Sequence, residues 1–260
     1  MVTHKAITIE EEIKLTRKSV ENPSLHYNLQ NGKSLTVIGT NHSRNRKDVQ
    51  FNYISKEIAK IKPDCVILEL PQKEIDRMKY DSKAIRWKYY GESGFIYNIL
   101  PENIIKIGGD IERNKLCQLL LKQDKFSKDE INAYRVYATM ISEIILYNQK
   151  VKSAIKRAGE FENVKITDKI KKIMNDYTKK YNNKELEMLT SKDDLTIYPL
   201  FKKCVLSRIA REIGQIRDCY MLKVIRKTSK SHNRIMFFAG RNHILRLKNR
   251  LNYYFLVQRK

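Results

Sequence analysis

Apolar and polar positions divide the chain into short strand-like runs separated by helix-like segments. Extended runs flank Asn31-Gly32, the dipeptide that a two-residue type I′ turn requires, which predicts a β-hairpin near the N-terminus. Residues 48–63 then place apolar side chains at helical spacing and end in a proline, which predicts a helix. Further strand-like runs cover residues 64–70, 103–110 and 234–240. A second short helix is expected at about 244–251.

The middle of the chain, from about 111 to 229, contains no strand-like run. One narrow apolar stripe, ending at Tyr177, lies on a helix whose other side is mostly lysine. A long helix is expected over residues 201–229. The pattern therefore predicts one α/β domain spanning residues 1–260, with a mostly parallel sheet flanked by helices, an N-terminal β-hairpin and a mainly helical insertion at about 111–229.

The charge balance is extreme, with 52 Lys and Arg against 29 Asp and Glu and a net charge of +23. Such a balance favours polyanionic partners, particularly nucleic acid, although lysines spread along a chain also occur as a solvated surface. The four cysteines form no C-x-x-C pair, and the N-terminus lacks the apolar core of a signal peptide. No run approaches the ~20 apolar residues of a membrane span. We therefore expect a cytoplasmic protein with no membrane span.

Two G-x-N-H frames, ending at His42 and His243, each follow an apolar strand-like run. Because the carboxyl ends of parallel strands meet at one edge of a sheet, both histidines are expected at the same edge. Glu69 closes a third strand-like run and Asp110 follows a fourth. The sequence therefore predicts a cluster of imidazoles and carboxylates at this edge.

Such a cluster permits two kinds of chemistry. Imidazole and carboxylate together can hold Zn, Co, Mn or Fe, and a bound metal generates a water nucleophile near neutral pH. Alternatively, a carboxylate or imidazole acts as a general base without metal. A third interpretation is that each histidine merely caps the helix that follows. Two matched frames with acidic residues between them favour a functional site over caps.

Arg217 lies inside the apolar stripe of the long helix, at i, i+3, i+4 and i+7 spacing from apolar neighbours. A guanidinium buried there needs a carboxylate partner or a bound anion. Glu69, Asp110 or a substrate carboxyl would serve. The alternative is that the side chain lies at the edge of the stripe and extends to water.

Six short motifs occur in an order that resembles the TraB/PrgY family, which groups with GumN, Tiki, erythromycin-esterase-like and ChaN-like proteins in one α/β superfamily. The motifs fall within roughly residues 25–125 and 201–251 and read G-T-N-H-S, K-P-D-C-V-I-L-E-L, Y-G-E-S-G-F, I-K-I-G-G-D-I-E-R-N, I-R-D-C-Y-M-L and F-F-A-G-R-N-H-I. Each motif alone is weak, and it is their order that makes the resemblance specific. One departure is Ile216, where the family usually has a glutamate before the arginine.

The resemblance implies a hydrolase, with a metal-dependent peptidase as one form, because Tiki proteins are described as such. Its motifs map onto the two histidines, Glu69, Arg217 with Asp218 and Met221, and Glu92. With the sequence pattern, it gives three sets of candidate residues: metal ligands His42, Glu69 and His243 for Mn, Co or Zn; catalytic Glu69, Arg217 and Glu92; and substrate-binding Asn41, Asn242 and Asp110. The expected substrate is a peptide or small molecule.

A different class of function remains open from the sequence. Fifteen tyrosines among many lysines could stack the bases of nucleic acid, so a basic nucleic-acid-binding protein or a nuclease is the alternative. Tyr177 and Tyr220, however, fall on apolar stripes, which favours a core position for such rings over base stacking.

Overall fold

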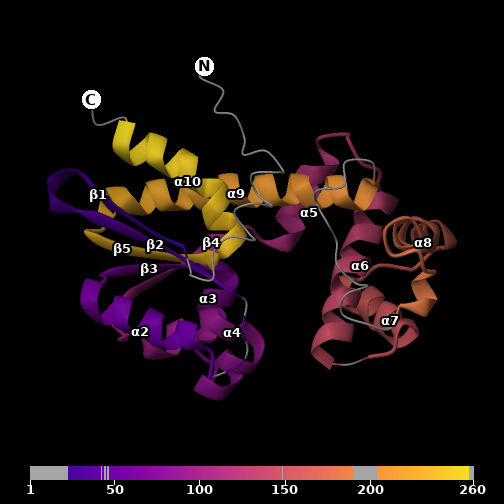
Figure 1. The fold of residues 1–260 in the computed structure, drawn as a ribbon, viewed down its shortest axis with the longest axis horizontal. Helices are drawn as coiled ribbons and strands as arrows, with labels where there is room; N and C mark the ends of the chain where they lie inside the picture. The colour runs from indigo at the N-terminus through magenta and orange to yellow at the C-terminus, as the bar shows by residue number, and fades with distance from the viewer. Residues whose placement is uncertain are drawn as a thin grey trace. The chain divides into compact units, whose positions relative to one another are not determined.

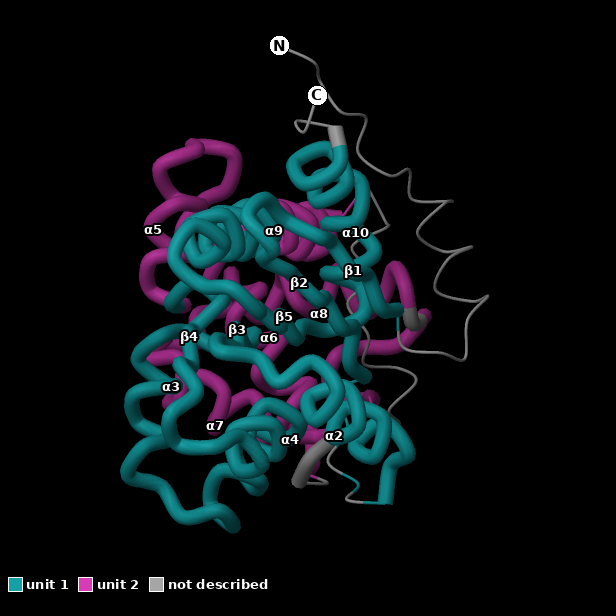
Figure 2. The backbone as a smooth tube through the Cα atoms, turned by 90° about the vertical axis from the view of Figure 1, so that its left-hand side faces the viewer, with its two compact units in different colours: residues 1–112, 217–260 teal, residues 113–216 magenta. Residues whose placement is uncertain are grey.

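The computed structural model describes residues 23–41, 43, 45, 47–147, 149–189 and 204–257. The chain divides into two compact units (Figure 2). Unit 1 comprises Met1–Glu112 and Arg217–Lys260, and unit 2 comprises Arg113–Ile216. The second boundary falls within one continuous helix, α9 (Val205–Ser231), which therefore contributes residues to both units.

Unit 1 is built on a five-stranded sheet in the order β1-β2-β5-β3-β4 (Figure 1). Its strands are β1 (Ser24–Asn28), β2 (Ser34–Thr40), β3 (Cys65–Pro71), β4 (Ile105–Asp110) and β5 (Arg234–Gly240). Strand β1 pairs antiparallel with β2, and the other pairs are parallel. The predicted α/β class, with a mostly parallel sheet and an N-terminal hairpin, is confirmed.

The hairpin turns at the dipeptide that predicted it. Asn31 and Gly32 have φ angles of 59° and 70°, and Lys33 N–H donates to the Gln30 carbonyl at 3.3 Å. Two consecutive positive φ angles characterise a type I′ turn, and its twist matches that of the strands on either side. Because β1 ends at Asn28 and β2 begins at Ser34, the turn lies within a longer loop.

Helices cover both faces of the sheet (Figure 1). One face packs against α2 (Val49–Ile61), α3 (Gln72–Met78) and α4 (Lys83–Ile99), and the other against α9 and α10 (Arg241–Asn252), which continues into η4 (Tyr253–Val257). The alternation of side chains along β3 explains the two cores, because Val66 and Leu68 face α2 to α4 whereas Cys65 and Ile67 face α9 and α10.

Helix α2 begins and ends where the sequence predicts. The Asp48 side chain accepts a hydrogen bond from Gln50 N–H at 3.0 Å, which satisfies one of the free amides of the first turn. Lys62 closes the helix in the left-handed conformation with a φ of 50°, and Pro63 prevents its continuation. This helix connects the end of β2 to the start of β3.

Unit 2 contains helices and loops but no strand among its described residues. It contains α5 (Arg113–Leu121), α6 (Lys128–Tyr147), α7 (Val151–Glu162), α8 (Asp168–Asn182), η2 (Leu186–Met188) and the start of α9. Tyr137 and Tyr177 pack edge to face in its core at a ring distance of 5.3 Å and are almost fully buried. Tyr177 is therefore a core residue, as its place on the apolar stripe predicts. No helix in the described part of the chain has the length and apolarity needed to cross a bilayer.

Candidate functional site

The candidate site lies at the edge of the unit 1 sheet where the parallel strands end. Thr40, the last residue of β2, pairs with Gly240, the last residue of β5, and Asp110 ends β4 beside Pro71 of β3. Glu69 precedes this edge by two residues, within a β3 that extends further than the sequence predicted. His243 lies in the first turn of α10, which begins three residues earlier than expected.

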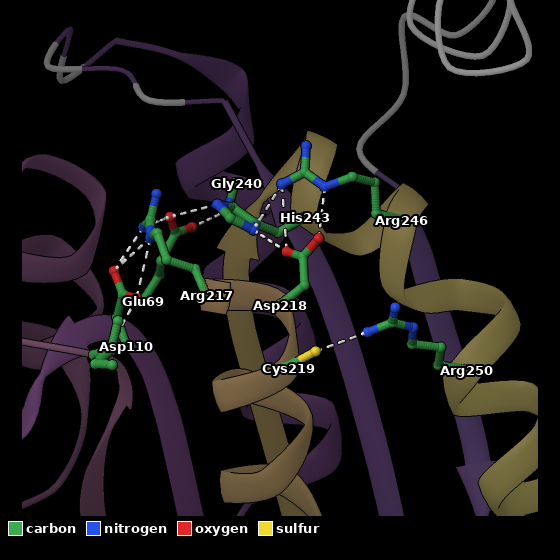
Figure 3. Close-up of polar contacts among 10 residues, drawn as sticks. Glu69, Asp110, Arg217, Asp218, Cys219, Gly240, His243, Arg246 and Arg250 are labelled. Carbon is green, nitrogen blue, oxygen red and sulfur yellow. Dashed lines mark hydrogen bonds and ion pairs between the residues drawn. The ribbon is translucent and has the colours of Figure 1, made fainter. Parts of the chain in front are cut away.

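Arg217 joins two of the strand-end carboxylates (Figure 3). Its Nε lies 3.1 and 3.0 Å from the two oxygens of Asp110, and its Nη2 lies 2.6 Å from Asp110 Oδ2 and 2.5 Å from Glu69 Oε1. Burial lowers the pKa of Arg217, but hydrogen bonds and charge from the two carboxylates outweigh this effect, so the pKa lies above its ordinary value. Arg217 thus contacts both of the partners proposed from the sequence, and its side chain is 27% exposed.

His243 contacts one carboxylate with each of its ring nitrogens. Its Nδ1 is 2.5 Å from Asp218 Oδ1, and its Nε2 is 3.2 Å from Glu69 Oε1. Burial lowers the pKa of His243, but hydrogen bonds to Asp218 and Glu69 reverse this effect and raise the pKa above its ordinary value. The surroundings therefore favour the imidazolium form of the ring.

The remaining contacts fix the two carboxylates that hold His243. Arg246 Nε donates to Asp218 Oδ2 at 2.6 Å, and the Gly240 N–H donates to Glu69 Oε2. Burial raises the pKa of Glu69 and of Asp218, but hydrogen bonds from His243 and the nearby cations lower both pKa values below the usual range. The site is thus a row of alternating charges, in the order Arg246, Asp218, His243, Glu69, Arg217 and Asp110 (Figure 3).

This row forms part of the wall of an open cavity of about 480 Å³. Four lining residues are arginine or histidine, and one is acidic; the full lining is Asn41, Glu69, Arg217, Gly240, Arg241, Asn242, His243 and Arg246. Arg217, His243 and Arg246 all pair with carboxylates, but two of these carboxylates, Asp110 and Asp218, are not among the described lining residues. The side chains that line the cavity are therefore mainly basic. Such a surface suits a ligand with negative charge.

The other predicted site residues differ in whether they line the cavity. Asn41 and Asn242 line the cavity, and the backbone N–H and C=O of Asn41 are held by the buried side chain of Gln50. Glu92 is buried in α4, next to a kink at Gly91 where φ is 53°, and is not among the described residues lining the cavity. His42 lies outside the described residues.

Sequence reasoning missed the contribution of Asp218 and Arg246. Asp218 entered only as a neighbour of Arg217 in a motif, yet it holds the imidazole of His243. Arg246 follows His243 by three residues, the spacing at which two helical side chains meet on one face, and both reach the same carboxylate. This spacing was the signal available in the sequence.

Two described atoms meet the geometry of a metal site. Two ligands at ~2.0 Å from a tetrahedral zinc lie about 3.3 Å apart, and the distance from His243 Nε2 to Glu69 Oε1 is 3.2 Å. A carboxylate on the other imidazole nitrogen, here Asp218, is typical of metal-binding histidines. Within the described residues no three His, Cys, Asp or Glu side chains are grouped to hold a metal.

Comparison with known proteins adds no family to these observations. No model of a known protein family matches the chain, and no curated protein is found to be similar to it. Membership of the TraB/PrgY family therefore stays a prediction from the order of six motifs. The function of the cavity has to be inferred from its geometry and charge.

Proposed function

We propose that unit 1 is a TraB/PrgY-like hydrolase that cleaves peptide or amide bonds in the cationic cavity with the help of a divalent metal. The observation that carries this proposal is the Asp218–His243–Glu69–Arg217 row on the cavity wall, with contacts of 2.5, 3.2 and 2.5 Å. It combines an oriented imidazole, a carboxylate and a guanidinium, which can serve acyl transfer as acid or base and as a stabiliser of negative charge. The four free cysteines fit the reducing cytoplasm in which we place the protein.

His243 Nε2 and Glu69 Oε1 would hold the metal, with His42 as the third ligand. When bound, Mn, Co or Zn would lower the pKa of a water molecule and so supply the nucleophile. Asp218 holds the ring through Nδ1, and the proton that Nε2 shares with Glu69 in the imidazolium form would be displaced by a bound metal. The Gly240 N–H fixes the second oxygen of Glu69 in the same way.

Arg217 supplies a fixed positive charge beside the reacting bond. Its Nε and Nη2 are engaged by carboxylates, while its Nη1 has no acceptor among the described residues, and the side chain lines the cavity. In this arrangement Nη1 can donate to the oxyanion of the tetrahedral intermediate or to a carboxylate of the substrate. Removal of one such donor typically reduces kcat by about 10²–10³-fold.

The substrate we propose is an acidic peptide. Arg241 and Arg246 add positive charge to the wall, and Asn41 and Asn242 add amide groups that can bind the backbone of a peptide. An acidic side chain or a free terminal carboxylate next to the scissile bond would lie against these arginines.

The test uses protein purified without a histidine tag, analysed for metal by mass spectrometry and assayed on paired peptides. Each acidic peptide is matched by a copy in which Gln replaces Glu and the C-terminus is amidated, with and without added Mn²⁺, Co²⁺ or Zn²⁺. We expect bound metal and faster cleavage of the acidic member. Cleavage that survives a chelator would contradict the metal, whereas absence of cleavage of every peptide would contradict the hydrolase.

A further inference from the structure

Unit 2 contains a second open cavity, of about 630 Å³, formed by α7, α8 and η2. Two of its lysines, Lys152 and Lys156, come from α7, and two, Lys171 and Lys172, come from α8. η2 contacts both helices. We call this cavity the lysine groove; none of its residues belongs to the site in unit 1.

The four lysines are exposed, and none of them forms an ion pair with a described residue. Two other lysines of α8 do form ion pairs: Lys169 pairs with Asp129 and Lys179 pairs with Glu185, both at 2.8 Å. The described lining also contains two acidic residues, Glu187 and Glu185, and Glu185 pairs with Lys179. Among the described lining residues the four lysines outnumber the two carboxylates, so the groove keeps a net positive charge. Such charge favours an anionic ligand.

The floor of the groove is aliphatic and fixed in place. Ile155 and Ile166 pack against the core of unit 2, and Leu186 is 4% exposed. Asn175 Oδ1 accepts a hydrogen bond from Leu186 N–H at 3.0 Å, which ties η2 to α8. No aromatic side chain is among the described residues that line the groove, so nucleobases have no stacking platform there.

We propose that the lysine groove binds an acidic peptide segment that carries aliphatic side chains. The carboxylates of the segment contact the four lysines, and its Leu, Ile or Val side chains pack on the aliphatic floor. Charge complementarity together with an apolar floor favours this occupant over nucleic acid, because isoleucine side chains offer bases no aromatic surface on which to stack. This binding is independent of any reaction in unit 1.

The experiment measures fluorescence anisotropy of labelled peptides with the full chain in a chelator, so that metal-dependent cleavage in unit 1 does not alter the probes. The first probe is a nine-residue peptide of alternating Glu and Leu; the comparison probes replace Leu by Ser, or Glu by Gln, and a fourth probe is an oligothymidine of nine nucleotides. We expect the Glu/Leu peptide to bind most tightly. Lys171→Gln together with Lys172→Gln should weaken it about five- to tenfold, since each exposed ion pair contributes roughly 0.2–1 kcal/mol.

The matched control is Lys169→Gln together with Lys180→Gln, which removes the same charge from the same helix outside the groove. Binding to this variant should be within about twofold of wild type. The proposal is overturned if the control weakens binding as much as the groove variant does. It is also overturned if the Ser-containing peptide or the oligothymidine binds as tightly as the Glu/Leu peptide, or if no probe binds.

Discussion

Asp218 makes the shortest contact with the imidazole of His243, with its Oδ1 2.5 Å from Nδ1. The aspartate lies on α9 and the histidine on α10, and both side chains are less than one tenth exposed. The contact fixes the ring and leaves Nε2 facing Glu69 on β3. In the proposed reaction Nε2 would thus be oriented before the substrate binds, which would remove part of the entropic cost.

Asp218→Asn tests this orientation. The amide keeps the shape of the side chain but no longer presents two anionic acceptors to His243 and Arg246, so kcat should fall about 10–100-fold while KM stays close to wild type. Steady-state kinetics on the best acidic peptide provide the measurement. Cys219→Ser, at the exposed neighbouring position on α9, is the control. Equal kcat in Asp218→Asn and wild type would mean that the contact does not serve catalysis.

Arg217→Gln should destabilise the fold as well as the site. The substitution leaves Glu69 and Asp110 close together with no cation between them, and breaking a buried ion pair in this way typically costs about 3–5 kcal/mol. Urea denaturation gives the free energy of unfolding. Lys223→Gln, an exposed position on the same helix, should change it by less than about 0.5 kcal/mol. A loss below about 1 kcal/mol in Arg217→Gln would contradict the assignment of a buried pair.

The pH dependence of stability should report the environment of His243. Burial lowers the pKa of His243, but hydrogen bonds to Asp218 and Glu69 outweigh this effect and raise the pKa above its ordinary value. A histidine with a raised pKa stabilises the fold fully below the unfolded value, and that stabilisation is lost as pH rises through the folded value. In a chelator, the free energy of unfolding should therefore decline as pH rises above about 6.5. His243→Gln should remove this part of the decline; an unchanged profile would contradict the raised pKa.

Two glycines should respond differently to alanine. A Cβ on Gly108 would lie 2.3 Å from Gln72 N, at the start of α3, so the backbone has to move and stability should fall by about 3 kcal/mol or more. A Cβ on Gly32 meets no atom within 4 Å, and only its φ of 70° opposes the substitution, at about 1 kcal/mol. Urea denaturation of Gly108→Ala and Gly32→Ala measures both losses. A larger loss of unfolding free energy in Gly32→Ala than in Gly108→Ala would contradict this prediction.

The fold and the main partners of Arg217 could be predicted because they follow from apolar pattern. Continuous apolar runs indicated buried parallel strands, and parallel strands bring their carboxyl ends to one edge. Arg217 lies inside an apolar stripe, so a carboxylate partner or a bound anion was one of two expectations, and Glu69 and Asp110 were the acidic residues at that edge. Burial is what made these inferences possible.

The rest of the site lacked such a signal. Asp218 and Arg246 are charged residues on helices, where most charges face solvent, so the apolar pattern did not indicate that both would contact the same imidazole. The three-residue spacing of His243 and Arg246 was the available signal, and it did not extend to Asp218. Glu92 was assigned to the site by motif alone. The kink at Gly91 is a tertiary feature of α4, and the strand and helix patterns gave no indication that it would leave Glu92 buried in that helix.

The central claim is that Glu69 and His243 together form the reaction centre of a hydrolase. The most direct measurement compares the cleavage rate of the best acidic peptide by wild type and by Glu69→Gln, His243→Ala and the control Arg250→Gln, which leaves the cavity lining intact. We predict a loss of about 10²–10⁴-fold in each of the first two variants and near wild-type activity in the control. Cleavage by Glu69→Gln and His243→Ala at the wild-type rate would contradict the assignment and would place the activity elsewhere on the chain.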